Sequence, residues 1–234
     1  MKKLVVILAA VAALSSCLQA KQGGGYMDLL KNVHWLGHDA FKITAGGKVI
    51  YIDPFRLKSA EKADLILITH AHHDHFSPED IRQISGPQTL VVSITEVLKG
   101  ISGLKQEVKP GDKLEAAGFK VEVVPAYNIN KKYHPKEAGM AGYIITAGGV
   151  RIYHAGDTDL IPEMKKMKVD VALLPVSGTY VMTSDEAAGA AKVIKPKVAV
   201  PMHYGSIAGS EDDADNFKEK LKGKINAVIL QQEK

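Results

Sequence analysis

The sequence is poor in cysteine, in aromatic residues and in long apolar runs. Its single cysteine, Cys17, excludes a disulfide within the chain. Aromatic residues make up 6% of the 234 positions, and the lysines behind the net charge of +4 are scattered, with Lys131-Lys132 the nearest approach to a cluster. Nucleic-acid binding requires a clustered basic face, often with aromatic side chains for stacking. We therefore expect no nucleic-acid partner.

One apolar run of ten or more residues occurs, at positions 4–14 behind two lysines. It is too short to span a bilayer as a helix and is typical of a secretory signal. The run ends in Leu-Ser-Ser-Cys17, which resembles a bacterial lipoprotein signal. We predict a signal peptide over 1–16, a lipidated Cys17 with a Gly-rich flexible tether over 17–26, and one globular domain over 27–234. The predicted location is a membrane, through the anchor on Cys17; cleavage after Ala20, giving a soluble periplasmic or secreted protein, is the alternative.

Within the domain, short Val, Ile and Leu runs alternate with amphipathic stretches. Apolar runs of four to eight residues between turn signals favour buried strands. Strands are predicted at 49–52, 65–68, 89–94, 121–124, 171–176, 197–202 and 227–230, and helices at 78–85, 95–100, 161–167, 185–194 and 212–221. The first of these helices has its own start signal, with Ser77 as N-cap and Pro78 at the first helical position.

One pattern occurs twice. Residues 41–47 read Phe-Lys-Ile-Thr-Ala-Gly-Gly before Ile50-Tyr51, and residues 143–149 read Tyr-Ile-Ile-Thr-Ala-Gly-Gly before Ile152-Tyr153. Each copy predicts a strand, a Gly-Gly turn and a second strand. Because one copy falls in each half, we predict an α/β fold, an αββα sandwich of two similar halves. A doubly wound single sheet is the alternative, but it would not explain the repeated hairpins.

Metal-ligating residue types follow the ends of predicted strands. The run 65–69 leads directly into His70, and in an extended chain His70 and His72 face the same way and can share one metal. Asp74 and His75 then supply a carboxylate and an imidazole for a neighbouring ion. Asp157, just past the strand that ends near 153, could bridge two cations, and His203, after the run 197–202, could complete the second site.

These motifs resemble the metallo-β-lactamase superfamily: His-x-His-x-Asp-His at 70–75, Gly-Asp-Thr at 156–158, and the late His203. Segments 35–38, 52–55, 153–158 and 201–205 are similar to a branch of small metal-dependent hydrolases related to ascorbate-6-phosphate lactonase and, more distantly, to N-acyl-phosphatidylethanolamine phospholipase D. The similarity covers nearly all of residues 33–203.

The resemblance implies a first metal held by His70 and His72, a second held by Asp74, His75 and His203, and a bridging Asp157. The family's third histidine for the first metal would follow the run 121–124, where this chain has Asn128 instead. Either Asn128 occupies that position or His134 supplies the imidazole. We favour His134, because an imidazole competes better than a neutral amide for a transition metal.

The predicted activity is hydrolysis of an ester-type bond, in a lactone or a phosphodiester, by hydroxide bound between two divalent ions. Zinc is the default ion, with manganese or iron possible. Asp74 is expected to orient the hydroxide. His38 is expected to face the mouth of the site and to bind substrate or protonate a leaving group; its alternative role is to orient a ligand.

Related activities are disfavoured by particular residues. Flavodiiron oxidoreductases of this fold carry glutamate at the position of His72, so redox chemistry is not expected. The predicted substrate is a small molecule or a lipid headgroup, with Tyr180 and Tyr204 as possible contacts. The alternative to an enzyme is a non-catalytic metal-binding protein on the cell surface, against which the presence of Asp74 speaks. His34, His73 and His154 are interpreted as structural.

Overall fold

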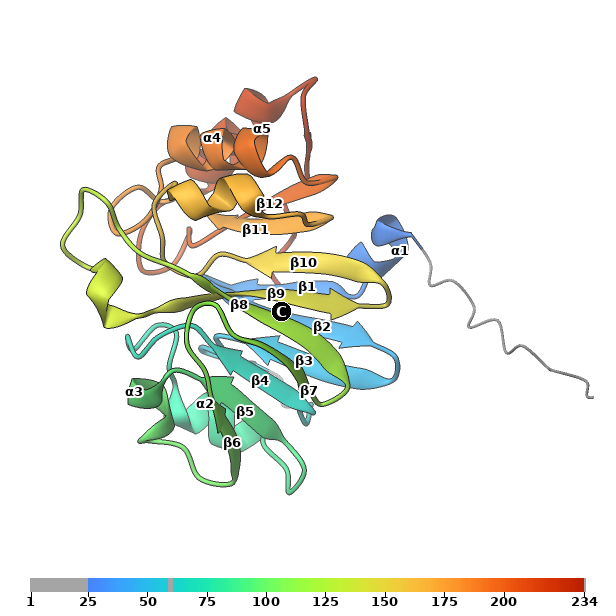
Figure 1. Cartoon of the computed structure of the whole chain (residues 1–234). Coiled ribbons are helices and arrows are strands. Elements are labelled where there is room, and N and C mark those ends of the chain that lie inside the picture. Colours follow the sequence, from blue (N-terminus) through green and yellow to red (C-terminus); the bar gives the residue numbers. More distant parts are fainter. Residues whose placement is uncertain (1–24, 59–60, 234) are drawn as a thin grey trace, which may run out of the picture.

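The computed structural model describes residues 25–58 and 61–233, and its two β-sheets pack face to face with helices on the outer sides (Figure 1). Helices α2 and α3 lie beside the first sheet, and α4 and α5 cover the second. This arrangement is the predicted αββα sandwich. The predicted signal peptide, Cys17 and nearly all of the predicted tether lie outside the described residues.

The first sheet has the order β1-β2-β3-β4-β5-β6, with strands Val33–Gly37, Ala40–Ala45, Lys48–Ile52, Leu65–Ile68, Leu90–Ser93 and Leu104–Glu107. The second has the order β13-β12-β11-β10-β9-β8-β7; in chain order from β7 its strands are Lys113–Ala116, Phe119–Pro125, Ala141–Ala147, Val150–His154, Val171–Pro175, Val198–Met202 and Asn226–Ala227. The α-helices α1 to α5 are Tyr26–Leu30, Pro78–Ile84, Thr95–Leu98, Ser184–Ile194 and Glu211–Leu221, and the 3₁₀ helices η1 and η2 are Lys136–Ala138 and Pro162–Lys166.

The two halves repeat one pairing pattern. From β1 to β6 the neighbours pair antiparallel twice and then parallel three times, and β8 to β13 follow the same sequence of pairings. The two Gly-Gly turns connect β2 to β3 and β9 to β10, which are equivalent positions in the two halves. Strand β7 has no counterpart in the first sheet and lies at the edge of the second sheet. The duplicated hairpin predicted from the sequence is therefore confirmed.

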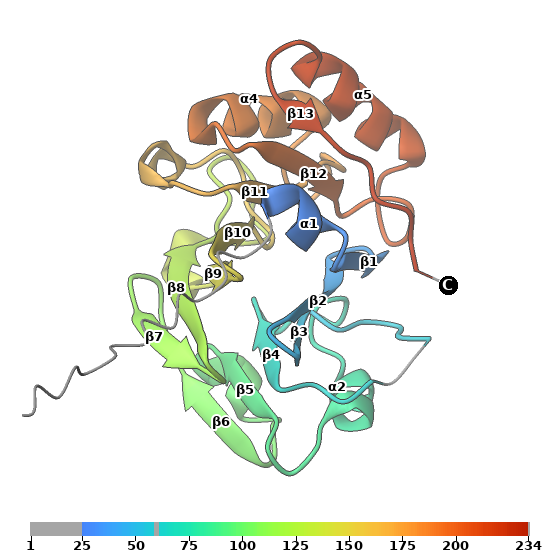
Figure 2. The same cartoon turned by 90° about the vertical axis from the view of Figure 1, so that its right-hand side faces the viewer.

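The central strands are covered on both faces. Every residue of β4, β11 and β12 is buried, because one face packs on the opposite sheet and the other packs under helices (Figure 2). Parallel strands in this situation read as continuous apolar runs, and these were the runs that predicted them. The parallel ladders also require each strand to end at the same edge of its sheet, which places the following loops together.

Two predicted elements need correction, and two strands were not predicted. The predicted helix 161–167 is the short 3₁₀ helix η2, which begins at Pro162. The predicted strand 227–230 is reduced to the two residues of β13, and residues 227–230 are half-buried. Strands β6 and β7 were missed because they lie at the sheet edges, where β6 is fully exposed and neither has an apolar run. The predicted N-cap of α2 is confirmed, since Ser77 Oγ accepts a hydrogen bond from Asp80 N at 3.3 Å.

No helix in residues 25–58 and 61–233 combines the length and apolar character that a bilayer crossing demands.

Gly142 in β9 provides a test of the packing beneath the loop after β10. A Cβ at this position would lie 2.8 Å from Ala155 O and 2.9 Å from His154 O, both backbone atoms that a side-chain rotation cannot move away. We expect Gly142→Ala to destabilise the fold by about 1–3 kcal/mol, as overpacking does. Gly86→Ala is the matched control, because its Cβ would meet Thr89 Oγ1 at 3.8 Å. Thermal unfolding measures both, and equal melting temperatures would contradict the packing described here.

Candidate metal centre

The loops that follow β4, β10 and β12 meet at one end of the sandwich, opposite α1 and the Gly-Gly turns (Figure 1). The loop after β4 carries residues 70–75, the loop after β10 carries Asp157, and His203 directly follows β12. Strand β4 belongs to the first sheet, whereas β10 and β12 belong to the second. The cluster is therefore assembled from both halves of the molecule.

Three imidazoles form the first group. The ligand-type nitrogens of His70, His72 and His134 lie within 4.8 Å of one another. His70 Nε2 is 3.0 Å and His134 Nε2 is 3.2 Å from His72 Nδ1. His70 and His134 are buried, while His72 is exposed at the surface of the cluster. A cation bound among these nitrogens would be open on the side of His72.

The structure brings His134 to this group and places Asn128 behind it. Asn128 Oδ1 lies 3.0 Å from His134 Nδ1, so the amide holds the imidazole by its far nitrogen. Asn128 Nδ2 in turn donates to Asp159 Oδ1 at 3.1 Å and to the backbone oxygen of Tyr180 at 3.0 Å. Of the two alternatives left open by the sequence, the geometry favours His134 as the ligand and gives Asn128 an orienting role.

The second group consists of Asp74, His75 and His203, with His38 beside them. Asp157 lies between the two groups. Its carboxylate oxygens are 3.2 Å from His134 Nε2, 3.3 Å from His75 Nε2 and 3.4 Å from His203 Nε2. A carboxylate in this position can reach a cation in either group.

Several atoms of the cluster that could bind a metal are buried and make no hydrogen bond within the described residues, in spite of the distances given above. Among them are His75 Nε2, His203 Nε2 and Asp157 Oδ1. Buried polar atoms are nearly always partnered in folded proteins. Imidazole nitrogens and carboxylate oxygens are ligands that zinc, manganese and iron accept. The residues present therefore fit divalent cations, and a cation would complete the contacts of these three atoms.

The far nitrogens of the same imidazoles are held by a second layer of polar groups. Asp53 accepts hydrogen bonds from Thr69 N at 2.8 Å and from Thr69 Oγ1 at 2.6 Å, and its carboxylate lies 2.7 Å from His75 Nδ1. Thr69 Oγ1 is also 2.9 Å from His70 Nδ1, and Ser177 Oγ is 2.8 Å from His203 Nδ1. Such contacts fix ring orientation and tautomer.

Asp53 was not assigned a role from the sequence, although it directly follows the apolar run 49–52. The same signal, a chemistry-bearing residue at the end of a buried strand, identified Asp157 and His203. Asp53 is fully buried and has a positive φ of 44°, a conformation tolerated by aspartate. Its neighbour in space, Asp39, is also buried and has no hydrogen-bond partner for either carboxylate oxygen in the described part of the chain.

The predicted position of His38 at the mouth is wrong. Its side chain is 1% exposed, and its Nε2 lies 3.1 Å from Asp74 Oδ2. The His38 backbone oxygen accepts from Trp35 Nε1 at 2.8 Å and from His203 N at 3.1 Å. The geometry matches the alternative role, in which His38 orients Asp74.

Other sequence predictions are placed as follows. Tyr204 is buried and stacks on Trp35 with ring centroids 4.7 Å apart, so it is not a substrate contact. His73 points to solvent, with 80% of its side chain exposed. His154 is buried, with Nε2 2.9 Å from Asp39 O, and His34 pairs with Glu233 at 2.9 Å. All three of these histidines lie outside the cluster, as expected.

Burial and charge set the protonation of the cluster. Burial lowers the pKa of His70 well below the usual range and lowers that of His72 too, so both rings are neutral and can act as ligands. Burial would raise the pKa of Asp157, but the charges of His203 and His75 outweigh it and hold that pKa well below the usual value. Conversely, Asp157 overcomes the effect of burial on His203 and raises its pKa to about 9. Without a cation, protons on the imidazoles compensate the buried carboxylate.

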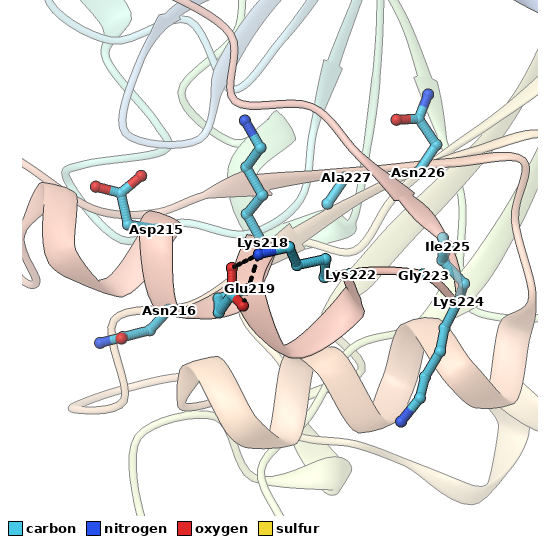
Figure 3. Close-up of a pocket in the computed structure, with 10 residues that line it drawn as sticks. All are labelled: Asp215, Asn216, Lys218, Glu219, Lys222, Gly223, Lys224, Ile225, Asn226 and Ala227. Carbon is cyan, nitrogen blue, oxygen red and sulfur yellow. Dashed lines mark hydrogen bonds and ion pairs between the residues drawn. The ribbon is translucent and has the colours of Figure 1, made fainter.

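Two hollows on the surface are candidates for the substrate-binding site. One, of about 790 Å³, lies against α5 and β13 and is lined by residues 215–227 such as Lys218 and Asn226 (Figure 3). It contains no histidine, and its Lys222 Nζ donates to the carboxylate of Glu219 at 3.1 and 3.2 Å. The other, of about 160 Å³, opens over the cluster and is lined in part by His72, Asp74 and Asp157. The ligand chemistry selects the smaller hollow.

A family model described as "Beta-lactamase superfamily domain" matches residues 32–203. The chain belongs to the metallo-β-lactamase superfamily. A relative named a metal-dependent hydrolase, from Thermococcus onnurineus, is 36% identical over 217 residues, covering 85% of this chain and 95% of the relative. One similar structure, assigned as a metal-dependent hydrolase of Parabacteroides distasonis, has a TM-score of 0.77 at 36% identity and covers 85% of this chain and 93% of its own. A novel metallo hydrolase from Ignicoccus hospitalis has a TM-score of 0.73 at 29% identity, covering 86% and 95%. The superfamily resemblance stated from the motifs is therefore confirmed.

The contribution of His134 to this superfamily site can be measured as bound metal. We expect His134→Ala to retain about one zinc ion fewer per chain than the unchanged protein, because two imidazoles hold zinc much less firmly than three. His34→Ala is the matched control, since this histidine lies outside the cluster and pairs with Glu233. Elemental analysis after dialysis measures both. Equal metal content in the His134→Ala variant and the control would contradict the assignment.

Proposed function

We propose that the protein is a metal-dependent hydrolase that holds two divalent cations and cleaves an ester-type bond, in a lactone or a phosphodiester. The observation that supports it most is the position of Asp157, whose carboxylate lies within 3.4 Å of His75, His134 and His203 and so reaches both groups of donors. The names of the relatives, metal-dependent hydrolases, support the hydrolase part of this proposal.

In this proposal His70, His72 and His134 hold the first cation, and Asp74, His75 and His203 hold the second, with Asp157 between them. Zinc is the default because an all-imidazole and carboxylate set suits it, and manganese and iron are the alternatives. Bound cations of this kind lower the pKa of water and polarise the oxygen of the bond to be cleaved. The second layer formed by Asp53, Thr69 and Ser177 keeps the ligands oriented.

Asp74 has the position required to act on water at the mouth of the site. It lines the hollow over the cluster and is 11% exposed. Burial would raise its pKa, but the contact with His38 and the charge of His75 outweigh it and lower that pKa below the usual range. Asp74 therefore remains a carboxylate, which can accept a hydrogen bond from the attacking water while His38 fixes its orientation.

The test is elemental analysis of the purified domain together with turnover of a lactone and a phosphodiester before and after chelation. We expect close to two metals per chain and turnover that chelation removes and metal restores. Asp74→Ala should abolish turnover, a loss of at least about 10²-fold, and lower the metal content. His34→Ala should retain both, because His34 pairs with Glu233 away from the hollow. Turnover that survives in Asp74→Ala would refute the role of Asp74, and bound metal with no turnover of any ester would favour the non-catalytic metal-binding protein.

We also propose, from the sequence alone, that the protein is exported and anchored to a membrane by lipid on Cys17. The support is the signal-like run ending in Leu-Ser-Ser-Cys17 and the Gly-rich segment before Gly25. Cys17→Ser should release the protein from the membrane fraction or leave it unprocessed, while a Ser16→Ala control should stay anchored. Mass spectrometry of the N-terminal peptide measures the lipid directly, and an unmodified Cys17 in the mature protein would disprove the anchor.

A further inference from the structure

The hollow over the cluster has a floor and a wall of different chemistry. Its floor consists of the cluster residues His72, Asp74, His134 and Asp157, which carry the proposed reaction. Its wall consists of Tyr133, Tyr180 and Ile207, residues that the proposed function does not use, and the exposed His73 also lines the hollow. Whatever is cleaved over the floor must also contact this wall.

The wall is apolar and aromatic. The rings of Tyr133 and Tyr180 meet edge to face, with centroids 4.7 Å apart and planes at 86°. Tyr133 is 41% exposed, although a ring of this size would gain free energy by burial. Exposed apolar surface beside a polar centre is typical of ligand pockets, in which apolar walls surround a few directed polar groups.

The wall is also held in place. The backbone oxygen of Tyr180 accepts a hydrogen bond from Asn128, the same residue whose Oδ1 lies 3.0 Å from His134 Nδ1. The loop of Tyr180 is closed on itself by hydrogen bonds from Gly178 N to Met182 O at 2.9 Å and from Thr179 N to Ser177 O at 3.0 Å. The aromatic wall and the first metal group are therefore positioned by one shared amide.

No lysine or arginine lines this hollow among the described residues. Two lysines stand beside Tyr133 in the sequence but outside the lining: Lys131 is bound to Asp159 at 2.5 Å and lies 3.9 Å from Glu186, and Lys132 Nζ lies over the Tyr133 ring, 5.9 Å from its centroid. Sites that recognise phosphate or carboxylate groups on a substrate use paired arginine or lysine donors. A substrate with an additional anionic group would find neither lysine nor arginine in this lining, whereas an uncharged substrate needs no such partner.

The size of the hollow limits the group that fits. Its volume of about 160 Å³ is close to the roughly 150 Å³ of an apolar cavity that accepts benzene. We propose that Tyr133, Tyr180 and Ile207 form the specificity pocket, and that the enzyme selects small uncharged carboxylic esters or lactones with an aromatic or comparably sized apolar group next to the cleaved bond. This inference rests on the proposed hydrolase function and narrows its substrate class from the two that the ligand set allows.

The test compares two ligands with the same charged head. Acetate and benzoate both carry one carboxylate for the cations, and they differ by a phenyl ring. In the zinc-loaded protein we expect benzoate to bind about tenfold or more tightly than acetate, measured by calorimetry, because the ring is buried against the wall. In Tyr180→Ala the preference should fall to about twofold, with acetate affinity unchanged. Tyr180→Phe, which keeps the ring, should keep the preference, and so should Tyr26→Ala, a tyrosine on α1 at the opposite end of the molecule.

The second measurement is the turnover of two aryl substrates. We expect kcat/KM for p-nitrophenyl acetate to exceed that for bis(p-nitrophenyl) phosphate, and Tyr133→Ala and Tyr180→Ala to raise KM for aryl esters more than they lower kcat. Equal binding of benzoate and acetate, or faster turnover of the phosphodiester, would overturn the specificity pocket while leaving the hydrolase intact. Failure of the protein to bind zinc, or of the zinc-loaded protein to turn over any ester, would overturn the proposed function itself. Circular dichroism of each variant separates these results from unfolding.

Discussion

The buried charge of Asp157 is the constraint on which the rest of the site depends. This carboxylate is 3% exposed and lies at the seam between the two sheets. An ionised carboxylate in such a place is costly unless positive charge or hydrogen bonds compensate it. The molecule surrounds it with imidazoles that come from the loops after β4 and β8 and from the residue that follows β12. Because these contributors belong to different halves of the fold, the charge can be compensated only when the halves are packed together.

The same requirement explains the second layer. Imidazoles that serve a buried carboxylate or a cation must present one particular nitrogen, so the other nitrogen has to be occupied. Asp53 and Thr69 do this for His75 and His70, Asn128 does it for His134, and Ser177 does it for His203. The positions of these partners at strand ends tie the geometry of the site to the sheets. Rigidity of the ligands and stability of the sandwich are thus two results of one hydrogen-bond network.

The network extends outward to the surface that would meet a substrate. Asn128 holds the far nitrogen of His134 and donates to the backbone of Tyr180, which connects the first group of donors to the aromatic wall. His38 holds Asp74 from the opposite side. The proposed reacting groups therefore stand between two fixed boundaries, and the opening over them has an apolar wall and neither lysine nor arginine in its lining among the described residues. The substrate class proposed above, a small uncharged ester, meets these conditions.

The sequence by itself determined the repeated hairpin, the buried parallel strands and the residues that follow them. Short Val, Ile and Leu runs and Gly-Gly turns report on local burial and local backbone conformation, and residues such as His70 or Asp157 are recognisable because they stand at the ends of these runs. The edge strands β6 and β7 were not predicted, because neither contains an apolar run that would indicate a buried strand. Only the tertiary structure placed His134 beside His70 and His72 with Asn128 behind it, and only the tertiary structure showed that His38 is buried beside Asp74. It also showed that Tyr204 stacks on Trp35 and that Tyr133 lies against Tyr180. These contacts join residues from different loops and sheets, and their distances depend on how the two halves pack, which no local pattern in the chain encodes.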